Sequence, residues 1–161
     1  KSEILSCNPK GIRLTTDRSA VDLFEIIMAA SPVPVTISGI ETNGYYDPAK
    51  KEIVLNKGLS DLEKPMVLLH EIAHHLAIEA NLHAKNKGSY PEAEVIAETA
   101  AFVAGYYLGM DTSSYAFPYV AGWGKDLDMI LAWGKSALQV AKQIINIVES
   151  ASEKEALKLA A

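Results

Sequence analysis

The chain has 161 residues, of which 49% are hydrophobic and 22% charged, and its formal net charge is −5. These values are typical of one globular domain, and the negative charge argues against a nucleic-acid-binding surface. A single cysteine, Cys7, excludes an intramolecular disulfide. No signal-peptide pattern opens the chain and no apolar run reaches the roughly eighteen residues of a membrane span, so we expect a cytoplasmic protein.

The first third of the chain carries the pattern of one helix followed by a small sheet. Residues 17–30 have apolar side chains at helical spacing, and Ser31-Pro32 ends this pattern. Residues 33–38 form a short run rich in β-branched residues. Two further strand-like runs within residues 45–55 flank a turn at Asp47-Pro48. We therefore predict an antiparallel sheet of about three strands.

A helix with the pattern of a metal site follows the sheet. His70 and His74 are four residues apart, so on a helix both imidazoles can reach one cation, and Glu71 lies beside it. The surrounding residues are apolar on nearly all sides, which predicts a buried helix. Histidines and a carboxylate are costly in such a place unless they are paired or metal-bound, so we favour a metal site over satisfied core histidines.

Local signals define the start of this helix and the role of the neighbouring histidine. Ser60 and Glu63 have capping-box spacing and Pro65 is tolerated only near a helix start, so the helix begins between Ser60 and Pro65. His75 points about 100° away from His74 on a helix. We expect His75 to be structural or exposed and not a ligand.

A third metal ligand is expected downstream, because a catalytic zinc takes three protein ligands and leaves the fourth position to water. A second apolar helix is predicted from Ser89 to Gly109, and Glu94 and Glu98 share one face of it with the small residues Ala101 and Gly105. One carboxylate can bind the metal while the other orients a ligating histidine. The residues alone leave both assignments open, and solvated surface glutamates are the alternative.

The rest of the chain completes an α+β domain. A long helix is predicted from residue 126, and residues 151–161 are expected to form a tail, either frayed or part of a linker, after a single domain of residues 1–150. The small antiparallel sheet should pack beside a helical bundle with the metal-binding helix in its core. An extended substrate could add to an edge strand, either the one with Ile53 and Leu55 or the one at Val35–Ser38.

Nineteen residues separate His74 from Glu94, and this spacing resembles the gluzincins, the thermolysin-like zinc metallopeptidases. By that resemblance Glu94 is the third ligand and Glu98 is the residue that orients a histidine. Residues 44–56, running into residues 69–76, are similar to the ImmA/IrrE-type zincin-like peptidases. There a β-hairpin leads into the active-site helix, so a zincin-like fold is implied.

The downstream half resembles the metallopeptidase domain of ArdC-type antirestriction proteins in Tyr90, residues 94–98, Leu108-Gly109 and the run from Tyr119 to Trp123. This resemblance implies a Zn²⁺-dependent peptidase of mobile genetic elements. No counterpart of the single-stranded-DNA-binding domain of those proteins is visible. The chain begins at Lys1 rather than at a methionine, which is compatible with a fragment of a longer polypeptide.

The expected function is therefore hydrolysis of a protein or peptide substrate, with no membrane or nucleic-acid partner for this domain alone. Glu71 is the expected general base. Tyr119 is the first candidate to stabilise the oxyanion, ahead of Tyr115 and His83, although packing of Tyr119 against Trp123 explains it equally well. The alternative is a non-catalytic regulatory or antirestriction protein that retains a metal site. Closed structural zinc sites usually have four ligands and prefer cysteine, which favours the catalytic interpretation.

Overall fold

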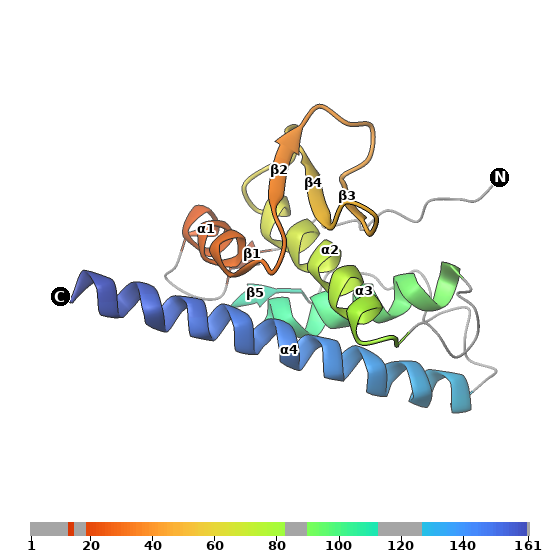
Figure 1. The fold of residues 1–161 in the computed structure, drawn as a ribbon. Helices are drawn as coiled ribbons and strands as arrows, with labels where there is room; N and C mark the ends of the chain where they lie inside the picture. The colour runs from red at the N-terminus through yellow and green to blue at the C-terminus, as the bar shows by residue number, and fades with distance from the viewer. Residues whose placement is uncertain (1–12, 15–18, 83–89, 113–126, 161) are drawn as a thin grey trace.

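A computed structural model describes residues 13–14, 19–82, 90–112 and 127–160 (Figure 1). These residues form an α+β structure with two small sheets and four helices. The strands are β1 (Arg13–Leu14), β2 (Val35–Ser38), β3 (Gly44–Asp47), β4 (Glu52–Asn56) and β5 (Met110–Asp111). The helices are α1 (Ala20–Ala30), α2 (Glu63–Glu79), α3 (Tyr90–Tyr107) and α4 (Leu127–Leu159). No helix among them combines the length and the apolar character that crossing a membrane requires.

The larger sheet is mixed, so the prediction of an antiparallel sheet is wrong for one of its strand pairs. The strand order is β2-β4-β3, in which β4 runs antiparallel to β3 and parallel to β2. The β3–β4 hairpin returns the chain into the space between β3 and β2, and β4 then has the direction of β2. Alternation of apolar residues reports which face of a strand is buried but not which strand is its neighbour, and this explains the error.

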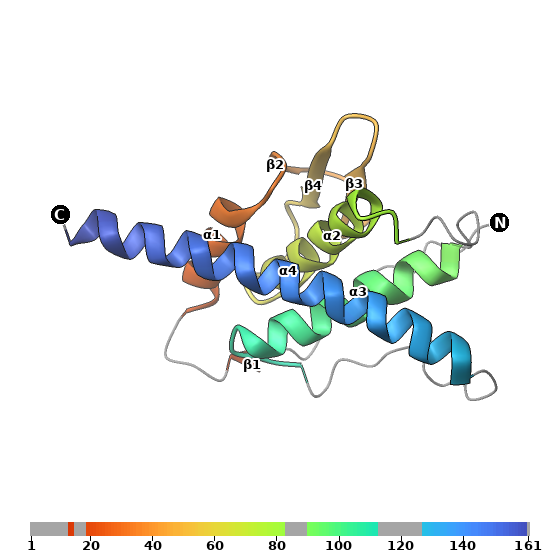
Figure 2. The ribbon, with the colours of Figure 1, turned by 60° about the horizontal axis from the view of Figure 1, so that its bottom comes forward.

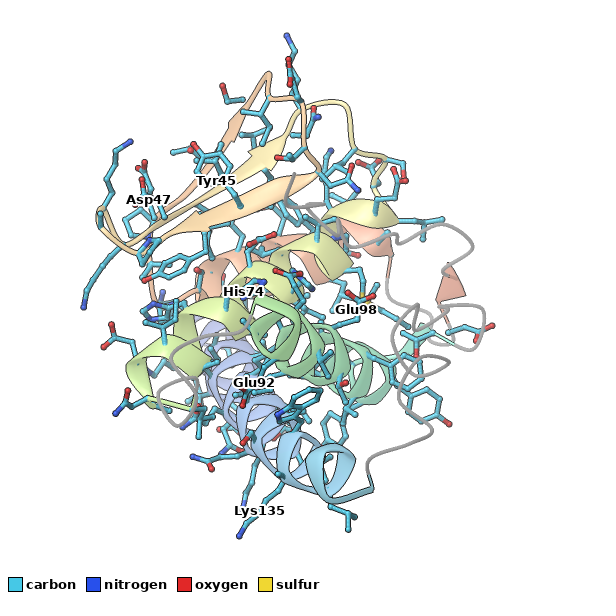
Figure 3. The ribbon with its side chains drawn as sticks, turned by 90° about the vertical axis from the view of Figure 1, so that its right-hand side faces the viewer. Tyr45, Asp47, His74, Glu92, Glu98 and Lys135 are labelled. Carbon is cyan, nitrogen blue, oxygen red and sulfur yellow. The ribbon has the colours of Figure 1, made fainter. Side chains whose placement is uncertain are left out.

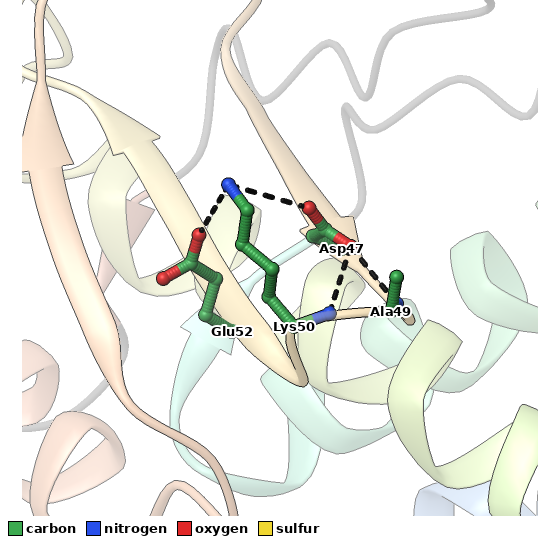
Figure 4. Close-up of polar contacts among 4 residues, drawn as sticks. All are labelled: Asp47, Ala49, Lys50 and Glu52. Carbon is green, nitrogen blue, oxygen red and sulfur yellow. Dashed lines mark hydrogen bonds and ion pairs between the residues drawn. The ribbon is translucent and has the colours of Figure 1, made fainter.

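The turn between β3 and β4 is built by Asp47. One of its carboxylate oxygens accepts hydrogen bonds from the backbone N–H groups of Ala49 (2.9 Å) and Lys50 (3.0 Å), as Figure 4 shows. The Lys50 ammonium group lies 3.3 Å from Glu52 and 3.7 Å from Asp47. Lys51 then adopts a positive φ of 52°, which closes the turn.

Helix α2 begins inside the predicted window because the capping box forms. The Ser60 N–H donates to Glu63 Oε2 over 2.9 Å, and the Glu63 N–H donates to Ser60 Oγ over 3.3 Å. Each bond gives a partner to a backbone N–H group that the start of a helix would otherwise leave unpaired. The helix then runs through an almost completely buried stretch from Pro65 to Ala73, as its apolar sequence predicts.

Helix α2 is the centre of the fold. The sheet lies on one side of it and α4 on the other, and α3 packs along both α2 and α4 (Figures 1 and 2). The α2–α3 contact is close at Gly105, where an added Cβ would lie 3.3 Å from Met66 Sδ. Helix α3 ends at the predicted cap, since Gly109 has a φ of 96° and its N–H donates to the Tyr106 carbonyl.

Helix α4 is longer than predicted. It continues to Leu159, through most of the segment that we expected to form a frayed tail after residue 150. The segment from Glu153 onward is exposed, so its helical state reflects the intrinsic propensity of its Glu, Lys, Ala and Leu residues rather than burial.

Candidate metal centre

Two helices bring three potential ligands to one point. His70 and His74 lie one turn apart on α2, and their Nε2 atoms are 3.1 Å from each other. The Glu94 carboxylate approaches from α3, with Oε2 3.5 Å from His70 Nε2 and Oε1 3.3 Å from His74 Nε2. Ligands about 2.1 Å from a tetrahedral zinc ion are about 3.4 Å from one another. The three residues therefore form a group that could hold a metal ion.

Glu98 lies behind this group, on the other side of the His70 ring. Its Oε2 atom is 3.8 Å from His70 Nδ1, a buried nitrogen without a hydrogen-bond partner within bonding distance. Figure 3 shows Glu98 and His74 where α3 and α2 meet below the sheet. The two glutamates thus face different nitrogens of His70: Glu94 faces Nε2 and Glu98 faces Nδ1. A carboxylate at Nδ1 is the usual means of orienting a metal-binding imidazole.

The four side chains are removed from water to different degrees. Those of His70, Glu94 and Glu98 are 4%, 8% and 6% exposed, whereas that of His74 is 16% exposed. His74 is therefore the most accessible of the four side chains. An accessible side is needed if a water molecule is to occupy a fourth ligand position.

The charges of the group favour a cation between its members. Burial lowers the pKa of His70. The neighbouring carboxylates of Glu94, Glu71 and Glu98 together raise it by more than burial lowers it, so the pKa of His70 is above its ordinary value. Burial likewise raises the pKa of Glu94, but hydrogen bonds from His70 and His74 outweigh it and lower the pKa to about 2. The buried histidines and the Glu94 carboxylate thus stabilise each other's charged forms.

Glu71 is buried beside the ligand group but does not belong to it. Its side chain leaves α2 about 100° around the helix from His70, towards the sheet. The backbone N–H of Tyr46 in β3 faces this carboxylate and helps to lower its pKa. Burial raises the pKa of Glu71, while the neighbouring histidines and the Tyr46 N–H oppose this effect. Glu71 is therefore a buried carboxylate beside the strand β3.

Tyr46 also contacts the histidine that follows the ligand pair. Its hydroxyl oxygen lies 2.9 Å from His75 Nδ1, and the two rings meet edge to face with centroids 5.2 Å apart. His75 is buried, and burial lowers its pKa. It contacts a strand rather than the ligand group, in agreement with the structural role expected for it.

Sequence reasoning missed Tyr46. A signal was present, because strand alternation places Gly44 and Tyr46 on the same face of β3, and a glycine next to a tyrosine is typical of a strand that closely approaches another element. An added Cβ at Gly44 would lie 2.9 Å from Val67 Cγ1, so β3 does lie directly against α2.

Two other expectations about the site have different outcomes. The strand with Ile53 and Leu55 is β4, which has a neighbour on both sides, so it cannot accept an added substrate strand. The outer strands of this sheet are β2 and β3, and β3 is the one that approaches Glu71.

The candidates for stabilising an oxyanion, Tyr119, Tyr115 and His83, lie outside the described residues, as do Cys7 and Trp123.

Comparisons with known proteins give one relative and no family. The chain is 32% identical over 109 residues to an uncharacterized protein of Bacillus anthracis. This alignment covers 64% of the chain but only 18% of the relative, so the chain spans less than a fifth of that protein's length. No protein-family profile matches the chain, and no solved structure matches it.

Proposed function

We propose that this chain is a zinc-dependent metallopeptidase domain whose metal ligands are His70, His74 and Glu94. The observation that carries the proposal is the convergence of two Nε2 atoms and one carboxylate at separations of 3.1 to 3.5 Å. Two imidazoles and a carboxylate are the donor set of many catalytic zinc sites, and they leave one position for water. When bound, a zinc ion supplies a Lewis acid that activates this water and polarises a carbonyl group.

The protein's own residues then have separate tasks. Glu98 faces Nδ1 of His70 at 3.8 Å and so favours the tautomer that carries its proton on Nδ1, which keeps Nε2 free for the metal. Glu71 accepts the proton of the attacking water on one carboxylate oxygen and later donates it to the leaving amine. The raised pKa of Glu71 suits this task, because a base that must also act as an acid works best when its pKa approaches the working pH.

The placement of β3 supports an extended protein segment as the substrate. Of the two outer strands, β3 lies against α2 at Glu71, so a segment alongside it would present its peptide bonds to the base. The resemblance to ArdC-type domains extends the proposal to antirestriction or the regulation of a mobile element, with a host or element protein as the substrate.

The test compares Glu71→Gln with the wild type and with Glu79→Gln, a matched substitution two turns along the same helix at an exposed position. We expect wild type and both variants to bind about one equivalent of zinc, as a preformed three-ligand site should. Hydrolysis of unfolded casein should fall at least about a hundredfold in Glu71→Gln and stay unchanged in Glu79→Gln. Wild-type protein without zinc or without hydrolysis would contradict the proposal, and biological activity that survives Glu71→Gln would favour the non-catalytic alternative.

A further inference from the structure

The side of α2 that faces the sheet is a row of four residues spaced four apart. Each of them meets β3 or the turn that follows it. The contacts pair Val67 with Gly44, Glu71 and His75 with Tyr46, and Glu79 with Lys51. The ligands His70 and His74 lie on the adjacent side, which faces α3. The sheet therefore contacts the proposed base Glu71, whereas the proposed ligands His70 and His74 face Glu94 on α3.

The pairing of β3 with β4 explains why the Tyr46 amide is available to Glu71. Tyr46 is opposite Ile53, and three residues earlier the Asn43 carbonyl accepts a hydrogen bond from the Asn56 N–H. Hydrogen-bonded and non-hydrogen-bonded pairs alternate along an antiparallel ladder. Asn43 and Tyr45 therefore bond to β4, while the N–H of Tyr46 points out of the sheet edge, towards the Glu71 carboxylate.

The two ends of Tyr46 act on neighbouring turns of the same helix. The backbone N–H reaches Glu71, and the hydroxyl reaches His75 one turn later. A tyrosine held at both ends has little freedom to slide along α2. The hydroxyl bond thus fixes the distance between the β3 backbone and the carboxylate.

We propose that Tyr46 and His75 are positioning residues for the base Glu71. The bond between the Tyr46 hydroxyl and His75 Nδ1 holds the β3 backbone in place. The Tyr46 N–H then binds one carboxylate oxygen of Glu71 and leaves the other free to accept the proton of the attacking water. This role rests on the proposed function, since it concerns the same base.

The Lys51–Glu79 ion pair provides a matched control. It joins the same hairpin to the same side of α2 over 2.9 Å, but its partners are 60% and 47% exposed. If the hairpin needed only attachment to α2, removal of this pair would have the same effect as removal of the tyrosine hydroxyl. Lys51→Asn is the suitable variant, because asparagine tolerates the positive φ of 52° at this position.

The experiment uses zinc-loaded protein with four variants: Tyr46→Phe, His75→Leu, His75→Asn and Lys51→Asn. Asparagine can place a polar atom near the position of Nδ1, so His75→Asn serves as the conservative rescue. We expect Tyr46→Phe and His75→Leu to lower kcat on a casein peptide about tenfold with little change in KM, because positioning of the base is impaired and binding is not. His75→Asn should recover most of kcat, and Lys51→Asn should stay within about twofold of the wild type.

A second readout is independent of catalysis. Hydrogen exchange of the Tyr46 amide, followed by NMR, should be slow in the wild type and at least about tenfold faster in Tyr46→Phe, His75→Leu and Glu71→Ala, since each weakens the same bond. Unchanged exchange in Glu71→Ala would overturn the proposal, as would an unchanged kcat in Tyr46→Phe. A wild type with a slowly exchanging Tyr46 amide and bound zinc but no hydrolysis would overturn the proposed function and, with it, this role.

Discussion

The Tyr46 hydroxyl lies 2.9 Å from Nδ1 of His75, the residue that directly follows a proposed metal ligand. One helix thus turns His74 towards α3 and His75 towards the sheet. Two adjacent imidazoles consequently have different chemistry, since one faces a carboxylate and the other a phenol.

The His75 environment predicts a pH dependence of stability. Burial lowers its pKa below the ordinary 6.5, so the folded protein binds fewer protons here than the unfolded chain does. The stability that His75 contributes is therefore complete above pH 6.5 and is lost as the pH falls towards the folded pKa. Urea unfolding of wild type and His75→Asn at pH 7.5 and pH 5.5, in the same metal state, should show a larger loss on acidification in the wild type. Equal losses would contradict the prediction.

Substitution of the two glutamates of α3 should separate a ligand from an orienting group. Glu98→Gln should weaken zinc binding about 10- to 100-fold, because it acts through His70. Glu94→Gln should weaken it further, because a direct ligand is lost. Competition with a chromogenic chelator measures both affinities, and Glu79→Gln serves as the surface control. If Glu98→Gln were the more damaging variant, the assignment of the two residues would be reversed.

Zinc binding should release protons in an amount that depends on pH. The pKa of His70 in the metal-free protein is raised above 6.5, so more than half of the His70 side chains are protonated at pH 6.5 and must lose this proton to bind zinc. Calorimetric titrations in buffers of different ionisation enthalpy should show roughly one proton released at this pH. The number should decrease as the pH rises through the pKa of His70. Proton release that stays constant from pH 6 to 9 would argue against the raised pKa.

Two glycines should respond to alanine in opposite directions. At Gly44 an added Cβ would lie 2.9 Å from Val67 Cγ1 and 3.2 Å from the Val54 carbonyl oxygen. Gly44→Ala should therefore lower the free energy of unfolding by about 1–3 kcal/mol. At Gly134, inside α4, an added Cβ meets no neighbouring atom of the described residues within 4 Å, so Gly134→Ala should raise it by about 0.5–1 kcal/mol. Denaturant unfolding of the two variants measures both effects.

The parts of this structure that follow from sequence are those with local causes. The capping box at Ser60 fixes the start of α2, Gly109 ends α3, and four-residue spacing places His70 beside His74. The approach of Glu94 could be inferred because α3 is apolar around it and must be buried. Glu94 and Glu98 face different nitrogens of His70. The residues alone do not predict which glutamate faces which nitrogen, because this depends on how the two helices pack.

Other parts depend on contacts between distant segments. The parallel pairing of β2 with β4 has no signature in either strand, because both arrangements expose and bury the same residues. The bond from Tyr46 to Glu71 involves a backbone amide, which every strand residue except proline possesses, so no residue type marks it. Residues 151–159 are helical although they lack the apolar spacing of a buried helix, because their intrinsic helix propensity is high. A prediction based on apolar spacing therefore ends the helix too early.

The position of β4 between β2 and β3 has a consequence for the synthesis of the chain. Among the described residues, β2 and β3 pair only with β4, so the larger sheet cannot form before residues 52–56 have been made. The last strand to be made supplies both sets of hydrogen bonds at once, and α2 begins seven residues after it ends. On the ribosome, the completed sheet and the first turn of α2 should therefore emerge within seconds of each other.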